Sequence, residues 1–417
     1  MTADAFSLLF VTFLLLGVLA RGGLMLRQIR HVRARRDEVP AAFAQDISLD
    51  SHRRAADYTC ARMRLALADT VTGALLALVL TLGGGLQAIH DVWARLFDAG
   101  GIAHGTALLA SLAVVGWVVE LPFGLYRTFV VEKRFGFNRM TPALFVADTI
   151  KSTALAALIG LPLLGGVLWL MGAMGTLWWL WVWAVWMAFN LLVLLVWPTF
   201  IAPLFNTFTP LADEALKARV EALLARCGFQ SKGLFVMDGS RRSAHGNAYF
   251  TGFGASKRIV FFDTLLAKLQ PEEVEAVLAH ELGHFRHHHI FKRLAVLAPA
   301  ALALFALLGG LMQTDWFYAG LGVNSAGTAM ALALFSLVLP AFSFPFVPLA
   351  SHWSRTHEFE ADRYAARQAS AGHLVAALVK LYRDNAATLT PDPLYSSVFD
   401  SHPPAAVRIL RLQAQGR

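Results

Sequence analysis

Cysteine is nearly absent from this chain, and charged residues are scarce. Only two cysteines, Cys60 and Cys227, occur among 417 residues. They form neither a disulfide framework nor a CxxC metal knuckle, so we expect free thiols. Charged residues make up 15% of the chain and hydrophobic residues 57%. A soluble domain does not hide that much apolar sequence, which excludes an ordinary soluble protein.

The positions of the basic residues argue against a nucleic-acid partner. The formal net charge is +8, and arginine (28) far outnumbers lysine (8). These residues lie between apolar segments and not along one amphipathic face, which is typical of a membrane topology signal. The excess of arginine, with abundant alanine, favours a GC-rich bacterial genome.

Seven apolar segments predict membrane-spanning helices, each of which needs about 20 residues. The segments are 5–20, 65–89, 104–126, 149–171, 176–200, 294–312 and 328–350. The first is short, but no basic region precedes it and no A-x-A-like site follows it, so we interpret it as a span and not as a signal peptide. The expected fold is therefore mainly α and multi-spanning.

The loops between these segments predict the orientation. Residues 21–64 contain ten arginines, whereas 90–103 contain one and 313–327 contain none. The positive-inside rule therefore places the N-terminus outside and residues 201–293 and 351–417 in the cytoplasm.

Two cytoplasmic pieces remain, separated by the last pair of spans. In the first piece, hydrophobic periodicity predicts helices over 211–228 and 271–289. Alternation and β-branched or aromatic content predict strands over 233–238, 247–253 and 257–263, with a hairpin turn at the GAS sequence between the last two.

Residues 280–284 have the sequence His-Glu-Leu-Gly-His, a motif typical of catalytic metal sites. Positions i and i+4 of a helix share one face, so His280 and His284 can bind one zinc ion. Glu281 is not placed to be the third ligand. It can instead take a proton from a zinc-bound water molecule and pass it to the leaving amine. The motif therefore predicts a zinc metalloprotease.

A rival pair at the same spacing is His284 and His288. With that pair, Phe285 stands where the catalytic glutamate belongs, and three ligands on one straight helix converge poorly on a tetrahedral ion. We therefore interpret His287 to His289 as a polar collar where the helix reaches the membrane surface.

The third ligand is expected downstream, because a catalytic zinc site uses three protein ligands and keeps one position open. Glu358 is the best candidate, and Asp362, one helical turn later on the same face, could accept the far N–H of a ligand histidine. The alternative is a solvated acidic helix face, which is how we interpret Glu360.

HELGH followed by ExxxD after a transmembrane hairpin resembles the integral-membrane type 1 CAAX prenyl proteases, a gluzincin family. The likeness extends over nearly the whole chain, through the stretches 135–138 (FGFN), 203–211, 243–252 (SAHGNAYFTG), 257–265, 392–395 (DPLY) and 402–408. It implies seven transmembrane helices around a water-filled chamber, with a cytoplasmic α+β zinc-metalloprotease domain.

The resemblance also implies roles for individual residues. One zinc ion per chain would bind His280, His284 and Glu358, with Glu281 as the general base. Behind these ligands would lie Asp362 and Arg408, His402 would lie near the substrate carbonyl, and the edge strand that binds the peptide would contain Asn247, Ala248 and Tyr249. Proteases commonly bind a substrate peptide as an added strand of a sheet, which independently supports the expectation that this edge strand binds the peptide.

Four regions follow from this interpretation. Residues 1–200 form a five-span membrane region with basic cytoplasmic loops, and residues 201–293 form the cytoplasmic catalytic region with the HExxH helix. Residues 294–350 form a transmembrane hairpin, and residues 351–417 form the C-terminal cytoplasmic segment with ExxxD.

The expected function is zinc-dependent hydrolysis of peptide bonds near the C-terminus of CAAX-type prenylated or other membrane-associated substrates. A bacterial source would place the protein in the inner membrane with its active site facing the cytoplasm, among membrane lipid. It would also favour a substrate other than an endogenous prenylated protein. The alternatives are a membrane-protein quality-control protease and, from another class, a channel or transporter with a structural zinc. A structural site normally has four protein ligands and no use for Glu281.

Overall fold

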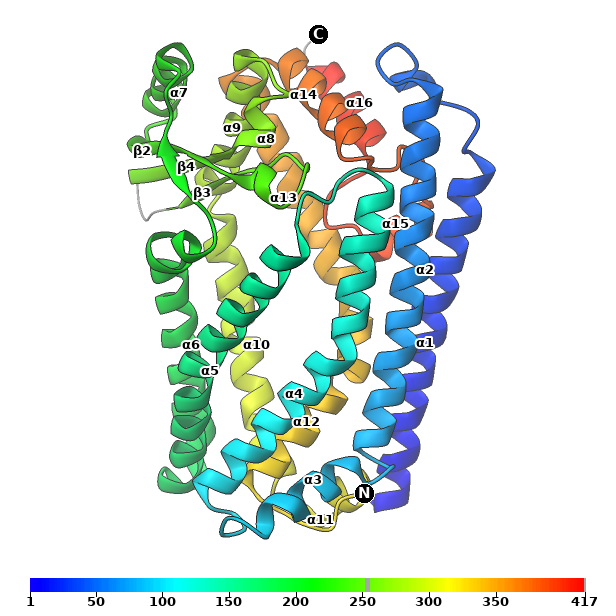
Figure 1. The fold of residues 1–417 in the computed structure, drawn as a ribbon, viewed down its shortest axis with the longest axis vertical. Helices are drawn as coiled ribbons and strands as arrows, with labels where there is room; N and C mark the ends of the chain where they lie inside the picture. The colour runs from blue at the N-terminus through cyan, green and yellow to red at the C-terminus, as the bar shows by residue number, and fades with distance from the viewer. Residues whose placement is uncertain (252–255, 416–417) are drawn as a thin grey trace.

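The computed structural model describes residues 1–251 and 256–415 and is predominantly helical (Figure 1). Within these residues, seven helical stretches are long and apolar enough to cross a membrane. They contain α1 (Ala3–Ala34), α2 (Leu49–Leu80), α4 (Ile102–Tyr126), α5 (Pro142–Ala173), α6 (Trp178–Val196), α10 (His289–Leu311) and α12 (Thr328–Ser343). The expected mainly α fold with seven spans is confirmed.

The membrane helices are apolar on all sides, and many of their large side chains are exposed. Leu158 of α5 and Phe200, just after α6, are examples, 73% and 67% exposed. A helix that is hydrophobic all round and yet exposed needs an apolar solvent, which a lipid bilayer supplies.

The second span ends earlier than the sequence indicates. α2 ends at Leu80 and not at residue 89, because three consecutive glycines form a tight turn there. Gly84 has a φ of +74°, and a Cβ on Gly83 or Gly85 would lie 2.7 or 2.9 Å from the carbonyl oxygen of Val79. Such a turn requires glycine. A separate short helix, α3 (Gly85–Ala94), follows it.

At the opposite end from the N-terminus lies a small α+β part (Figure 1). Its four strands are β1 (Phe208–Pro210), β2 (Gln230–Met237), β3 (Ala248–Thr251) and β4 (Ser256–Phe262). They form one sheet in the order β1-β2-β4-β3, with β2 and β4 parallel and the other pairs antiparallel. The three expected strands and the β3–β4 pairing are confirmed, whereas most of the GAS turn and Gly252 lie outside the described residues.

Helices surround this sheet and bury its aliphatic and aromatic side chains. They are α7 (Glu214–Arg226), α8 (Asp263–Leu266), α9 (Pro271–Arg286), α13 (Val347–Gln368), α14 (Ala371–Asp384) and α16 (Ala405–Gln415). The short helix α15 (Pro393–Phe399) packs on α13 and α1 instead. The shared core includes Leu223 of α7, Phe261 of β4, Leu278 of α9 and Leu374 of α14. α13 continues from α12 through a short 3-10 turn at Phe344–Phe346, so one nearly continuous helical stretch connects the membrane to the core.

The helix that carries the HELGH motif is well capped at its start. Gln270 and Glu273 form a reciprocal capping box, and Pro271 occupies the first turn. The helix ends at Arg286 and not at residue 289. His288 has a φ of 56°, and a left-handed residue just past the last turn ends a helix. The membrane helix α10 then begins at His289 in a new direction.

Candidate metal centre

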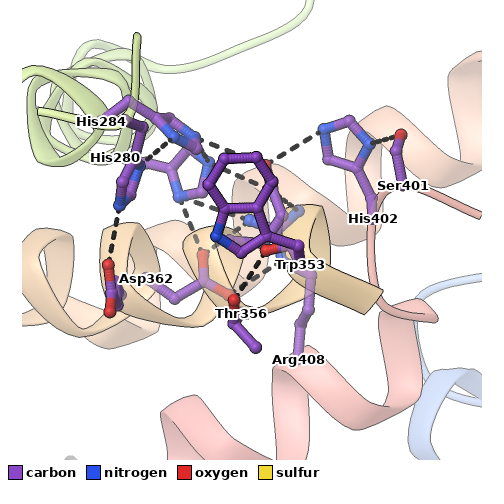
Figure 2. Close-up of polar contacts among 11 residues, drawn as sticks. His280, His284, Trp353, Thr356, Asp362, Ser401, His402 and Arg408 are labelled. Atoms are coloured by element: carbon purple, nitrogen blue, oxygen red, sulfur yellow. Dashed lines mark hydrogen bonds and ion pairs between the residues drawn. The ribbon is translucent and has the colours of Figure 1, made fainter. Parts of the chain in front are cut away.

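Close packing of α9 on α13 brings the two halves of the motif together. Gly283 lies against Ala361: a Cβ at Gly283 would be 2.8 Å from the Cα of Ala361. Only a glycine permits this approach. As a result, His280 and His284 of α9 face α13 (Figure 2). Both rings lie close to Glu358 on that helix.

Three ligand atoms converge on one point. The Nε2 atoms of His280 and His284 lie 3.3 Å apart. Each is 3.4 Å from a carboxylate oxygen of Glu358. The ligand atoms of these three residues all lie within 4.8 Å of one another, close enough for one metal ion.

The chemistry of this group fits a cation. Glu358 is only 4% exposed, and its Oε2 atom makes no hydrogen bond within the described part of the chain. A buried carboxylate oxygen with no hydrogen bond is costly unless a cation compensates it. Arg408 lies 3.7 Å from this oxygen, but its guanidinium already forms a two-point ion pair with Asp362. Two imidazole nitrogens facing each other need the same compensation, so these residues can hold a metal ion.

Behind His280, a buried ion pair fixes the ring. The Nδ1 atom of His280 lies 2.9 Å from Oδ1 of Asp362, which in turn accepts hydrogen bonds from Arg408. Burial lowers the pKa of His280, but the adjacent carboxylates of Asp362 and Glu358 outweigh it and raise the pKa to about 9. With Nδ1 donating to Asp362, Nε2 is directed at Glu358.

Behind His284 lies a second support that the sequence did not indicate. The Nε2 atom of His289 is 2.7 Å from Oε2 of Glu360, and its Nδ1 is 2.8 Å from Nδ1 of His284. Since a carboxylate can only accept, His289 donates through Nε2. In neutral His289, Nδ1 then accepts from His284, which leaves the Nε2 lone pair of His284 facing Glu358.

This support corrects two sequence interpretations. His289 is buried and stacks on His357 at a ring distance of 4.0 Å, so it does not belong to a polar collar. Glu360 accepts from His289 and is not merely a solvated acid. His288, by contrast, is exposed as expected for a collar.

Glu281, which follows His280 on α9, and His402 are the two residues expected to act in catalysis. Glu281 makes no hydrogen bond or ion pair with any other described residue, so its carboxylate is available to water or substrate. The Nε2 atom of His402 is 3.4 Å from Oε1 of Glu358, and its side chain remains 61% exposed. Figure 2 shows His402 approaching from a different segment than His280 and His284, with Ser401 beside it. Its Nδ1 is 3.0 Å from the hydroxyl oxygen of Ser401.

The strand with the expected substrate residues lies at the edge of the sheet. β3 pairs only with β4, so its other edge is free of a strand partner within the described sheet. The rings of Phe250 in β3 and Phe285 in α9 are 5.8 Å apart, which puts this strand beside the helix of the HELGH motif. Ala248 and Tyr249 lie within β3, and Asn247 directly precedes it.

The FGFN and SAHGN stretches meet in one network. The ring of Phe137 stacks on His245 at 4.3 Å, and Asn138 pairs with Ser243 as an isolated bridge. His245 also contacts Asn385 Oδ1 at 3.2 Å and Glu132 Oε2 at 3.4 Å. These contacts hold the sheet region against the end of the third membrane stretch.

Two parts of the chain match models of known protein families. Residues 28–207 match the model for the CAAX prenyl protease N-terminal region with five membrane helices. Residues 210–415 match the model for peptidase family M48.

Individual relatives cover most of the chain. CAAX prenyl protease 1 of Saccharomyces cerevisiae is 36% identical over 327 residues, 75% of this chain and 72% of the relative. The Oryza sativa homolog is 36% identical over 317 residues, 75% and 74% of the two chains. The crystal structure of S. mikatae Ste24p has a TM-score of 0.91 and 31% identity, covering 99% of this chain and 100% of that one.

Proposed function

We propose that this chain, which belongs to peptidase family M48, uses one zinc ion on His280, His284 and Glu358 to cut CAAX-type substrates near their C-terminus. The chain is an integral membrane protein and a metalloendopeptidase. The observation that carries the proposal is the convergence of three ligand atoms within 4.8 Å. Glu281, the neighbour of His280 in the sequence, pairs with no other described residue.

Zinc suits this donor set better than magnesium or calcium does. Two imidazoles and one carboxylate with an open position form a common catalytic zinc site, whereas magnesium and calcium prefer oxygen ligands. When bound, zinc polarises the scissile carbonyl and lowers the pKa of water to about 7.

The protein's own residues supply the remaining chemistry. Glu281, adjacent to His280 and without a competing partner, takes a proton from the attacking water and transfers it to the leaving amine. The exposed His402 donates through Nε2 to the carbonyl oxygen as negative charge develops there. Asp362 and Arg408 keep His280 in its orientation throughout.

The edge strand β3 is the proposed substrate dock. An extended peptide that adds to its free edge places its scissile bond in a fixed register, and Asn247, Ala248 and Tyr249 would contact it. A cavity of about 710 Å³, lined by His402, His245 and Tyr58 among others, offers room for the released C-terminal residues. The names of the relatives support a prenylated substrate, and we propose no role for nucleic acid.

We also propose that the metal centre faces the cytoplasm of a bacterial inner membrane and the N-terminus faces outside. The arginine-rich residues 21–64 support this orientation through the positive-inside rule. Figure 1 has the N-terminus at the end opposite the sheet, which is consistent with it. Within this arrangement we retain the division into regions 1–200, 201–293, 294–350 and 351–417.

The test measures zinc content and cleavage of a farnesylated CAAX peptide in detergent. Wild type, Glu281→Ala and the control Glu221→Ala, at an exposed position on α7, are compared side by side. We expect about one zinc in all three, cleavage after the cysteine by wild type and control, and a loss of at least about a hundredfold in Glu281→Ala.

Three results would contradict all or part of the proposal. Undiminished cleavage by Glu281→Ala would remove the assigned base. Zinc without cleavage of either this peptide or an unmodified membrane-protein fragment would favour a structural zinc. Cleavage of the fragment alone would keep the zinc protease and reject the CAAX substrate.

A further inference from the structure

A basic pocket lies in the groove between α9 and α13, apart from the three proposed metal ligands. Its volume is about 670 Å³, and its walls include Arg226, Arg286, Arg363 and Arg367. Four guanidinium groups from three helices therefore surround one space. Neither His280, His284 nor Glu358 lines it.

Most of this positive charge is uncompensated. Arg226 donates to Glu275 at 2.6 Å, and the acid in the pocket wall, Glu360, already pairs with Lys292 at 3.5 Å and accepts from His289 at 2.7 Å. Arg286, Arg363 and Arg367 make no hydrogen bond or ion pair with any described residue. Like charges gathered around one space repel each other, and an anion in that space relieves the repulsion.

The position of the pocket indicates where such an anion comes from. Arg286 is the last residue of α9, and α10, a membrane helix, begins three residues later. Ile290 and Phe291 at its start are 43% and 62% exposed, as expected of side chains in contact with lipid. Five residues of chain span at most about 18 Å, so the pocket lies near the headgroup layer, which extends several ångströms beyond the hydrocarbon core.

From these observations we propose that the pocket binds the phosphate headgroup of an anionic phospholipid. Planar guanidinium groups bind phosphate oxygens two at a time, which makes arginine well suited to this chemistry. A neighbouring bilayer supplies the ligand at high local concentration, and the acyl chains remain against Ile290 and Phe291.

Binding would also connect the two helices of the metal centre. Arg286 belongs to the helix that carries His280 and His284, while Arg363 and Arg367 belong to the helix that carries Glu358. A phosphate bridging them stabilises the α9–α13 pair without contacting the metal site.

The test is native mass spectrometry of the full chain in neutral detergent, titrated with phosphatidylglycerol or phosphatidylcholine. The pocket variant is Arg286→Gln/Arg363→Gln/Arg367→Gln. The control Arg30→Gln/Lys232→Gln/Arg241→Gln also removes three positive charges, from exposed positions outside the pocket. Each basic residue near an anionic headgroup strengthens binding about fivefold.

Wild type and control should hold one phosphatidylglycerol at least about tenfold more tightly than phosphatidylcholine, and the pocket variant should lose this preference. An equal preference in the pocket variant, or none in wild type, overturns the proposal.

Millimolar inorganic phosphate is added in a parallel arm. If phosphate displaces the bound phosphatidylglycerol completely, free phosphate and not lipid is the ligand. Should the triple variant misfold, the single variant Arg367→Glu, at an exposed position, gives the same comparison.

Discussion

Arg408 and Asp362 form a two-point ion pair in the interior of the protein. Nε of Arg408 donates to Oδ2 of Asp362 at 2.9 Å, and Nη2 donates to Oδ1 at 2.6 Å. Both side chains are buried, and Asp362 also accepts from His280. The last helix of the chain thus orients a proposed metal ligand on α9.

The first prediction concerns this support. Asp362→Asn removes the charged acceptor for His280 and breaks the two-point ion pair with Arg408, which keeps only Glu358, 3.7 Å away, as a buried counter-charge. We expect metal affinity to fall about 10- to 100-fold, measured by competition with a calibrated chelator. The control Asp315→Asn, at an exposed position on α11 (Asp315–Ala319), should leave the affinity unchanged. Equal affinity in both variants would show that Asp362 does not position the ligand.

A second prediction tests the other support. His289→Leu removes the group that lies between Glu360 and Nδ1 of His284, so His284 loses its fixed tautomer. Metal affinity should decrease by about tenfold or more in the same chelator competition. The matched change His373→Leu, at an exposed position on α14, should have no effect. If the two variants behave alike, the His289 contact contributes nothing to metal binding.

These two supports differ in how far the sequence could indicate them. Asp362 is four residues after Glu358, and this helical spacing placed both on one face. His289 is five residues after His284, which in a straight helix turns it about 140° away. Only the break at His288, with its φ of 56°, brings His289 back to His284. Periodicity assumes a regular helix, so it could not reveal this contact.

The fold shows the same division between regular and irregular features. Seven spans and three strands follow from apolar length and alternation, and the structure confirms them. The end of α2 at Leu80 depends on how close Gly83 and Gly85 approach the backbone of Val79, which no hydrophobic pattern records. The pairing of Glu360 with His289 likewise depends on tertiary packing.

A third prediction concerns the contact between the two helices of the metal centre. Gly283→Ala places a Cβ 2.8 Å from Cα and 3.1 Å from the carbonyl oxygen of Ala361, so backbone must move. Such overpacking costs about 1–3 kcal/mol, which exceeds the gain in helix propensity. We expect a lower thermal midpoint and weaker metal binding. Gly73→Ala on α2, where a Cβ meets nothing within 4 Å, should be neutral or slightly stabilising. A Gly283→Ala variant as stable as Gly73→Ala would refute the close-packing argument.

The fourth prediction is a pH dependence at Asp392, which joins α15 to α1. Its carboxylate accepts from the backbone N–H groups of Leu394 and Tyr395, and from Nε of Arg27 at 2.9 Å. Burial raises the pKa of Asp392, but the N–H of Tyr395 and the Arg27 guanidinium outweigh it, so the pKa lies below its ordinary value.

A depressed pKa in the folded state means that folding favours the carboxylate. The resulting stability is fully present above the pKa of this carboxyl in the unfolded chain, about 3.9, and is lost as pH falls through its lower pKa in the folded state.

Asp392→Asn keeps the helix cap, because asparagine caps as well as aspartate, but it loses the ion pair. It should therefore cost about 1 kcal/mol at pH 7, and this difference from wild type should shrink below about pH 4. Thermal unfolding of both proteins in detergent across this range measures the difference, with Asp98→Asn in an exposed loop as the control. A stability difference between the two proteins that is the same at every pH would mean that the charge of Asp392 does not contribute to stability.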